Sequence, residues 1–143
     1  MMPIVTDTGF ASDDLDMRFA AIDALPANGP LAVDLAPDAD LDPVLLRLPE
    51  IAVIRVAFPS FADGRGFSIA RILRRAGFTG RLRAAGHLIA DQYAMARRSG
   101  FDEVEIDEDL AARQPEAEWR ARADWRAHDY QRRLGRRPDL QTA

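Results

Sequence analysis

The chain of 143 residues contains no cysteine. This absence excludes disulfide bonds, thiolate nucleophiles, cysteine-based zinc sites and iron–sulfur clusters ligated by this chain. Lysine is absent too, because all 19 basic residues are arginine. Schiff-base chemistry and a P-loop lysine each need a lysine amine, so both of these mechanisms are also excluded.

Histidines are few, and long apolar runs are missing. His87 and His128 are the only two histidines, and no two potential ligands have metal-site spacing. We therefore expect neither a metal nor any other cofactor. No run approaches the roughly 20 apolar residues that a membrane helix needs. The first 16 residues lack the basic and apolar regions of a secretory signal, so we expect a cytoplasmic protein with no membrane contact.

The sequence does have a strongly uneven distribution of charge. Residues 1–50 carry ten acidic and two basic side chains, and residues 51–100 carry two acidic and nine basic. Residues 101–143 carry eleven acidic and eight basic side chains, which brings the net charge to −4. The acidic flanks argue against nucleic-acid binding. A small oxyanion, a phosphorylated ligand or an acidic protein partner fits the basic central third better.

Apolar and β-branched runs alternate with helical patterns, which predicts an α/β fold. The expected strands are residues 31–35, 51–56, 81–85 and 104–106, the last of them at an edge. The expected helices are residues 43–48, 67–76, 88–99 and 116–134, with a further short helix at 19–25. Residues 107–109 are expected to form an acidic turn before the last helix. Crossovers of this length predict about four parallel strands. The sheet is either open or curved like part of a barrel, and a curved sheet would favour a homodimer.

This order of elements predicts one domain with three parts. Residues 1–29 form a peripheral N-terminal segment laid over the domain, residues 30–110 form the α/β core, and residues 111–143 form a C-terminal helix and tail. The helix at 67–76 places its apolar residues at i, i+3, i+4 and i+7. We therefore expect Ile69, Ile72, Leu73 and Ala76 on its inner face.

A first candidate site follows the second strand, where ligands usually bind in α/β proteins. Glycine lets the backbone approach a ligand, and a helix N-terminus offers free amide donors, so Gly64 and Gly66 with Arg65 suit a small oxyanion. Ser68 follows on the first helical turn. The alternative is a tight turn in which Asp63 caps the helix and Arg65 pairs with it. The third glycine of a dinucleotide fingerprint is missing.

A second candidate site follows the third strand, on the same edge of a parallel sheet. It contains Arg83, Gly86, His87, Asp91 and Gln92. A neutral histidine at a helix N-terminus suits a base or a hydrogen-bond donor. The alternatives are a solvent-facing turn histidine and an Asp91 that complements the helix dipole. A buried amide at Gln92 needs hydrogen-bond partners.

Several motifs in order carry a resemblance to a known family. They are the segment from Phe61 to Arg74, the segment from Gly80 to Gly86, the pair Asp91-Gln92 and the segment from Arg98 to Asp102. The chain resembles, over about residues 30–106 and at Tyr130-Gln131, a small bacterial family of unknown function. Its genes typically lie beside assimilatory sulfite reductase, and it is described as a probable oxidoreductase of sulfite reduction. The resemblance implies a role in sulfate assimilation and cysteine synthesis. His87 stands where that family is expected to have a small polar or acidic residue.

Three functions follow as hypotheses. The first is an accessory protein without a redox centre, which binds a small oxyanion or docks onto sulfite reductase or another acidic redox protein. The second is an enzyme acting on an anionic substrate, with Asp63 as acid/base and Arg65 and Arg83 as anion clamps. It requires these three side chains and Asp91 to converge on one pocket. The third is a structural subunit whose arginines at positions 71, 74 and 75 meet an acidic partner.

Overall fold

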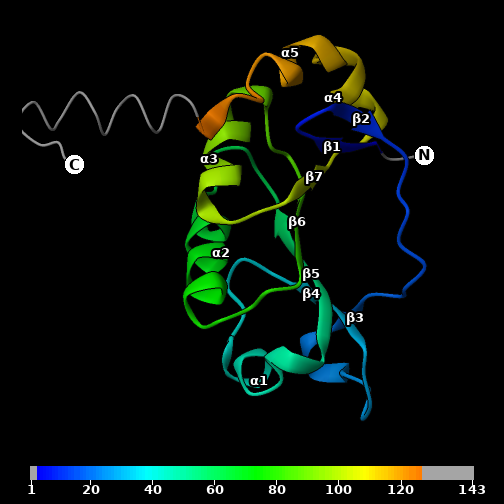
Figure 1. Cartoon of the computed structure of the whole chain (residues 1–143), viewed down its shortest axis with the longest axis vertical. Coiled ribbons are helices and arrows are strands. Elements are labelled where there is room, and N and C mark those ends of the chain that lie inside the picture. Colours follow the sequence, from blue (N-terminus) through cyan, green and yellow to red (C-terminus); the bar gives the residue numbers. More distant parts are fainter. Residues whose placement is uncertain (1–2, 127–143) are drawn as a thin grey trace, which may run out of the picture.

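The computed structural model describes residues 3–126 of the chain. Within them, seven strands form one mixed sheet that is open, in the order β2-β1-β7-β6-β5-β4-β3 (Figure 1). The strands are β1 (Ile4–Thr6), β2 (Gly9–Ala11), β3 (Ala20–Ala21), β4 (Leu31–Leu35), β5 (Ile51–Phe58), β6 (Arg81–Gly86) and β7 (Glu103–Glu105). The α-helices are α1 (Asp42–Leu45), α2 (Arg65–Arg75), α3 (Tyr93–Ser99), α4 (Glu108–Arg113) and α5 (Glu116–Arg120). The predicted α/β class is confirmed, and the sheet is not closed into a barrel.

The parallel part of the sheet contains five strands, from β3 through β4, β5 and β6 to β7. The four expected strands are all present, and β5 and β6 are the best-paired neighbours, from Val53 opposite Arg81 to Phe58 opposite Gly86. The expectation of an edge strand at 104–106 is wrong, because β1 pairs antiparallel with β7 on its outer side. Val104 and Ile106 are accordingly buried.

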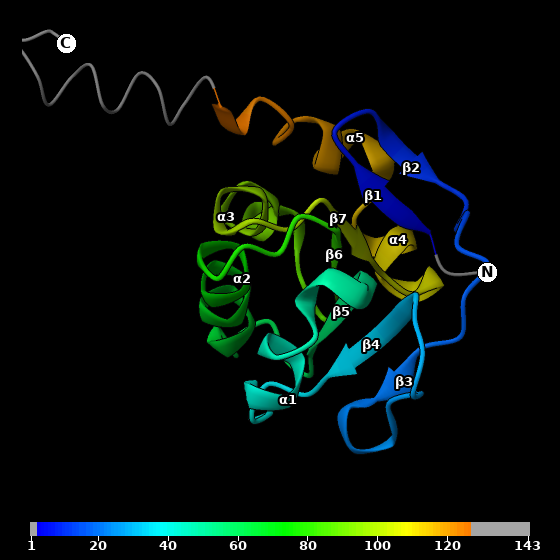
Figure 2. The same cartoon turned by 60° about the horizontal axis from the view of Figure 1, so that its bottom comes forward.

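The N-terminal region is part of the sheet and not only the expected peripheral segment. It supplies the β1–β2 hairpin at one end and β3 at the other. The predicted short helix at 19–25 is wrong, because Ala20 and Ala21 pair with β4 and only the 3₁₀ turn Ile22–Ala24 follows. The segment between β2 and β3 crosses the sheet in extended form (Figures 1 and 2).

Helices α2 and α3 cover one face of the sheet, opposite the N-terminal segment (Figure 1). Gly66, Phe67, Ile69, Ala70 and Leu73 are the buried residues of α2. Of the residues expected on the inner face, Ile69 and Leu73 are buried, but Ile72 is 43% exposed and Ala76 is exposed. The buried face of α2 is therefore rotated around the helix axis relative to the predicted one.

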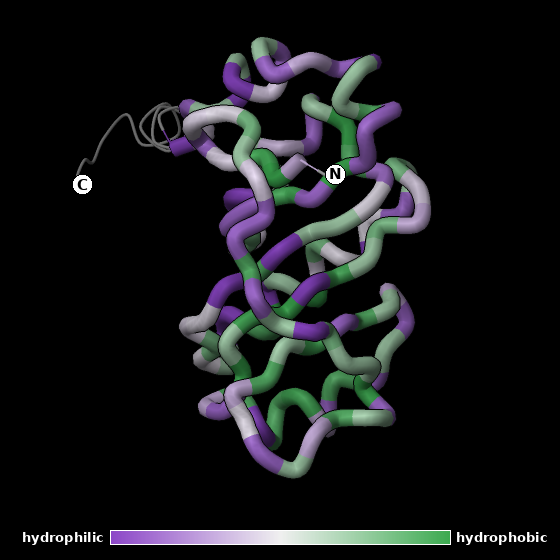
Figure 3. Tube along the Cα trace, turned by 90° about the vertical axis from the view of Figure 1, so that its right-hand side faces the viewer, coloured by the Kyte–Doolittle hydropathy of each residue, from purple (hydrophilic) through white to green (hydrophobic). Residues whose placement is uncertain are grey.

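The other face of the sheet carries charged side chains. Hydrophilic and hydrophobic segments alternate along the chain on this side (Figure 3). The register of the ladders aligns Arg55, Arg83 and Glu103 across β5, β6 and β7, and Glu105 lies two residues further along β7. The sheet is therefore apolar towards the helices and largely ionic towards the N-terminal segment.

The end of the described chain contains two short helices instead of the start of one long one. The residues expected as an acidic turn begin α4, because the Asp107 carboxylate accepts a hydrogen bond from the Leu110 N–H at 2.7 Å. The expected helix at 116–134 is present as α5 as far as Arg120, and residues 127–134 lie outside the described range. Trp119 on α5 is buried against the β1–β2 end of the sheet.

Among residues 3–126, no helix has the length and apolar character needed to cross a bilayer.

Candidate functional site

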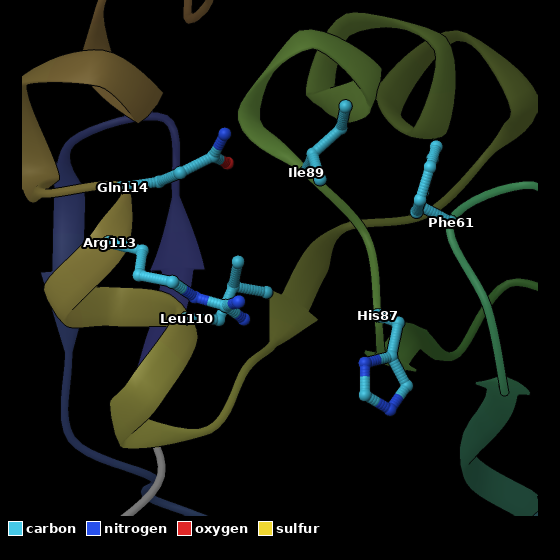
Figure 4. A pocket seen from close by; sticks show the side chains of 6 residues that line it. All are labelled: Phe61, His87, Ile89, Leu110, Arg113 and Gln114. Carbon is cyan, nitrogen blue, oxygen red and sulfur yellow. The ribbon is translucent and has the colours of Figure 1, made fainter.

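A cleft of about 310 Å³ opens at the carboxyl edge of the parallel strands. It lies between the loops that follow β5 and β6 and the helix that follows β7 (Figure 4). Its lining consists of Phe61, His87, Ile89, Leu110, Arg113 and Gln114. We call this the rim pocket. Ligands of open α/β folds usually bind at the carboxyl ends of the parallel strands, so the rim pocket is the first candidate site in the structure.

Hydrogen bonds between the surrounding loops hold the rim pocket in shape. The Gln114 Oε1 accepts a hydrogen bond from the Ala90 N–H at 2.6 Å, which ties the end of α4 to the loop after β6. The Gln92 Nε2 donates to the Phe61 carbonyl at 2.7 Å, while its Oε1 accepts from the Ile89 N–H at 3.0 Å. Gln92 therefore joins the loops after β5 and β6, which gives its amide the partners that a buried amide needs.

Gly86 sets the path of the chain into this pocket. Its φ is +124°, and a Cβ there would lie 2.5 Å from the Phe58 carbonyl oxygen. The next N–H, that of His87, donates to the same oxygen at 2.9 Å. Only glycine fits this close approach without strain. Gly86 thus has a structural role, and His87 is exposed and lines the pocket.

The loop before α2 contains an internal ion pair where an external anion was expected. The Asp63 carboxylate accepts hydrogen bonds from the Arg65 N–H at 3.1 Å and from its Nε at 3.0 Å. These bonds from Arg65 lower the pKa of Asp63 to about 2. A carboxylate of that pKa is a weak base at neutral pH. The tight-turn alternative therefore describes this loop.

The other residues of the site that the sequence predicted before α2 also have structural roles or partners. A Cβ at Gly66 would lie 2.4 Å from the Phe58 ring, so this glycine lets α2 pack on the ring. Gly64 has a φ of −91° and space around it. The Ser68 hydroxyl accepts a long hydrogen bond, 3.5 Å, from Arg71. None of Gly64, Gly66 and Ser68 lines the rim pocket.

Arg83, the other predicted anion clamp, lies inside the protein. Its side chain is fully buried, and its guanidinium donates to Glu103 at 2.6 Å, to Glu105 at 2.9 Å and to both oxygens of Asp13 at 3.0 and 3.1 Å. Burial alone would lower the pKa of Arg83, but the hydrogen bonds that it donates to Asp13 and Glu103 reverse this and raise it. Carboxylates of the chain itself therefore bind the guanidinium, where an external anion was expected.

The four side chains that the enzyme hypothesis needs in one pocket do not come together. Asp63 pairs with Arg65, Asp91 pairs with Arg122, and Arg83 lies on the ionic face of the sheet. None of these residues lines the rim pocket, and of the predicted site residues only His87 does. Across residues 3–126, no three acidic or histidine side chains are grouped so that they could hold a metal ion.

The pocket residues missed from the sequence come mainly from α4. Leu110, Arg113 and Gln114 lie on α4 or at its end, where the sequence predicts an acidic turn at residues 107–109 and no helix. An Asp followed by two acidic residues and a leucine is also a typical helix start, and this signal would have revealed α4. No local signal placed Phe61 or Ile89 beside that helix.

A second candidate site is the outward surface of α2 and α3, which lie side by side (Figure 1). Ser68, Arg71, Ile72 and Arg75 form an exposed stripe of α2 at i, i+3, i+4 and i+7. On α3, Met95 is exposed and Arg98 is half-buried. The Arg71 Nη1 reaches the Ser99 Oγ at 3.1 Å and so bridges the two helices. We call these six exposed or half-buried residues, 68, 71, 72, 75, 95 and 98, the arginine face.

Fold and site together define an open-sheet α/β protein with a small pocket at the carboxyl edge of its strands. The chain belongs to a family described as bacterial protein of unknown function (DUF934), whose model matches residues 32–140. No curated protein and no solved structure matches the chain.

Proposed function

We propose that this chain is a non-catalytic accessory protein of assimilatory sulfite reduction that docks through its arginine face onto an acidic surface of the reductase. The observation that carries the proposal is a set of three arginines, Arg71, Arg75 and Arg98. Within residues 3–126 they have no carboxylate partner.

The composition of the two helices produces this excess of positive charge. Helices α2 and α3 contain six arginines and no acidic residue. The other three arginines of these helices are paired. Arg65 binds Asp63, Arg74 binds Asp102 and Arg97 binds Asp7. Arg74 also donates to the carbonyls of Phe78, Gly80 and Gly100, so it belongs to the fold and not to the docking surface.

Apolar side chains lie among the free charges. Ile72 is 43% exposed and Met95 is 48% exposed. Methionine and arginine are enriched in protein interfaces, whereas lysine and the acidic residues are depleted there. An apolar centre with arginines around it suits a protein surface that carries Asp and Glu. Nucleic acid is a weaker fit, since the chain as a whole is acidic.

The assignment to sulfite reduction is supported by the resemblance of the motifs around residues 61–74 and 80–86 to a family whose genes lie beside sulfite reductase. The docking role is favoured over catalysis because Asp63 is paired with Arg65 and Arg83 is enclosed by carboxylates. It is also favoured over oxyanion binding at the α2 N-terminus, where the Asp63 carboxylate already accepts the Arg65 N–H.

The test measures binding to purified sulfite reductase of the same organism by surface plasmon resonance. We expect binding that weakens steeply between about 50 and 300 mM salt. The double variant Arg71→Glu/Arg75→Glu should bind at least about tenfold more weakly, because two attractive charges become repulsive.

The matched control is Arg18→Glu/Arg120→Glu, which makes the same change in net charge at exposed arginines outside the arginine face. It should keep the affinity of the unmodified chain. Equal weakening by both double variants, or no binding of the reductase at low salt, would contradict the proposal. Binding of a DNA or RNA oligonucleotide through the same arginines in place of the reductase would also contradict it.

A further inference from the structure

The rim pocket is separate from the arginine face and has the dimensions of a small-molecule site. Its volume of about 310 Å³ equals that of roughly ten water molecules in the liquid. This lies at the lower end of the range for ligand pockets. A ligand of about ten non-hydrogen atoms would fill it.

The polar groups of the rim pocket are donors, and none is acidic. The lining includes the guanidinium of Arg113, the imidazole of His87 and the amide of Gln114, and it includes no carboxylate. Arg113 extends from α4 over Leu110 towards the opposite wall, where His87 lies (Figure 4). Within the described residues Arg113 has no ion-pair partner. The guanidinium is therefore free to bind an anionic group in bidentate fashion.

In the Gln114 amide, the oxygen accepts a hydrogen bond and the nitrogen is available as a donor. Its Oε1 accepts the Ala90 N–H, which fixes the orientation of the side chain. Its Nε2 makes no hydrogen bond with a described residue and is left as a donor at the wall of the pocket. Arg113, His87 and Gln114 are therefore all able to donate to acceptor atoms of one ligand.

The remaining lining is apolar. Phe61, Ile89 and Leu110 supply an aromatic ring and two aliphatic side chains. Phe61 is 58% exposed, so much of its ring surface is open to water. Covering these three side chains with an apolar group of a ligand would remove their surface from water. A hydrated inorganic ion would leave them uncovered.

We propose that the rim pocket binds a small organic anion, with a carboxylate, sulfonate or phosphate head at Arg113 and an apolar body against Phe61, Ile89 and Leu110. Helix-dipole complementation explains why an arginine stands in the last turn of α4. It does not explain why the side chain turns into a pocket that holds an imidazole and no carboxylate. This ligand site is independent of docking through the arginine face.

The experiment is a titration of the full chain followed by ¹H–¹⁵N correlation spectra at constant ionic strength. The probes are benzoate and its neutral counterpart benzamide, with benzenesulfonate and benzenesulfonamide as a second pair. Acetate and inorganic phosphate test the head group without the aromatic body. We expect each aromatic anion to shift resonances of residues 61, 87, 89 and 110–114, with a dissociation constant at least about tenfold below that of its neutral partner.

The variant Arg113→Gln should remove the preference for the anion while leaving the apolar contribution of the ring. Arg120→Gln, an exposed arginine of α5 outside the pocket, is the control and should retain the preference. Equal binding of benzoate and benzamide, shifts at other residues, or no saturation by any probe would overturn the proposal. Binding of phosphate or acetate as tight as that of the aromatic anions would overturn the part that assigns the apolar body.

Discussion

At the scale of single residues, the arginines of the central third mostly bind acidic residues of the same chain. Arg83 is the clearest example, because its guanidinium contacts three carboxylates from two regions far apart in the sequence. Glu105 is shared with Arg55, which also binds Asp34 at 2.6 Å. The result is a network of ion pairs from β4 to β7, in which Asp34, Arg55, Glu105, Arg83 and Glu103 follow one another with alternating charge.

Replacing Arg83 by Met should destabilise the protein by up to about 3–5 kcal/mol, because the buried Glu103 and Glu105 would keep only Arg81 and Arg55 as cationic partners. The measurement is the free energy of unfolding in urea. Adding Glu103→Gln to Arg83→Met removes one of the two buried charges that lose Arg83, and it should restore part of the stability. If the double variant were as unstable as the sum of the two single variants, the two residues would not be coupled.

The sequence could indicate Asp63 and Arg65 as a pair, since they are two residues apart and a tight turn was one of the two alternatives. It could not indicate the partners of Arg83. Those depend on which strand lies next to β6 and in what register, and on the path of the segment around Asp13. Such contacts between distant segments leave no local pattern.

At the scale of elements, local patterns were sufficient for β4, β5 and α2, and β6 could be predicted from its position between two helices. It failed for β1, β2 and β3, which have two or three residues each and exist because a neighbouring strand pairs with them. The same pairing moved β7 from the edge to the interior. The pocket was mislocated along the rim for a related reason, since α4 was expected to be a turn.

The junction of β5 and α2 gives a prediction that separates two neighbouring glycines. Gly66→Ala should destabilise the fold by about 1–3 kcal/mol, because the new Cβ would lie 2.4 Å from the Phe58 ring. Gly64→Ala should change stability by less than about 1 kcal/mol, since its φ is −91° and its nearest neighbour, the Phe67 ring, is 3.8 Å away. Thermal and urea unfolding of both variants provide the measurement.

The results for these two variants also test whether the N-terminus of α2 binds an oxyanion. Similar and large losses of stability for both variants would show that the loop conformation itself depends on Gly64. A neutral Gly64→Ala variant that lost affinity for sulfate or phosphate would instead restore the oxyanion interpretation of the α2 N-terminus.

At the scale of the whole molecule, the uneven charge distribution of the sequence becomes a set of contacts between its thirds. Of the nine arginines in residues 51–100, Arg55, Arg81 and Arg83 meet acids of both flanking thirds, as Arg97 also does. Arg74 meets Asp102 and Arg65 meets Asp63. The other three, Arg71, Arg75 and Arg98, belong to the arginine face. Most of the arginines in the basic third therefore bind acidic residues within the chain.

This arrangement predicts how stability depends on pH. Hydrogen bonds from Arg83 lower the pKa of Asp13 to about 2 in the folded state, against an ordinary value of 3.8. A lowered folded-state pKa means that the stabilisation is present above pH 4 and is lost as the pH falls from about 4 to about 2. Because the Asp13 side chain is 41% exposed, solvent screening reduces its contribution to about 1 kcal/mol.

Asp13→Asn should lower the free energy of unfolding at pH 7 by about that amount and flatten its fall between pH 4 and pH 2. The measurement is a series of urea unfolding curves across this pH range. Asp16→Asn is the matched control, since Asp16 lies in the same segment and forms no ion pair with a described residue. It should keep the pH dependence of the unmodified chain. If Asp13→Asn kept that dependence as well, the N-terminal segment would not be held to the sheet by Arg83 in solution, and the ionic face of the sheet would be open.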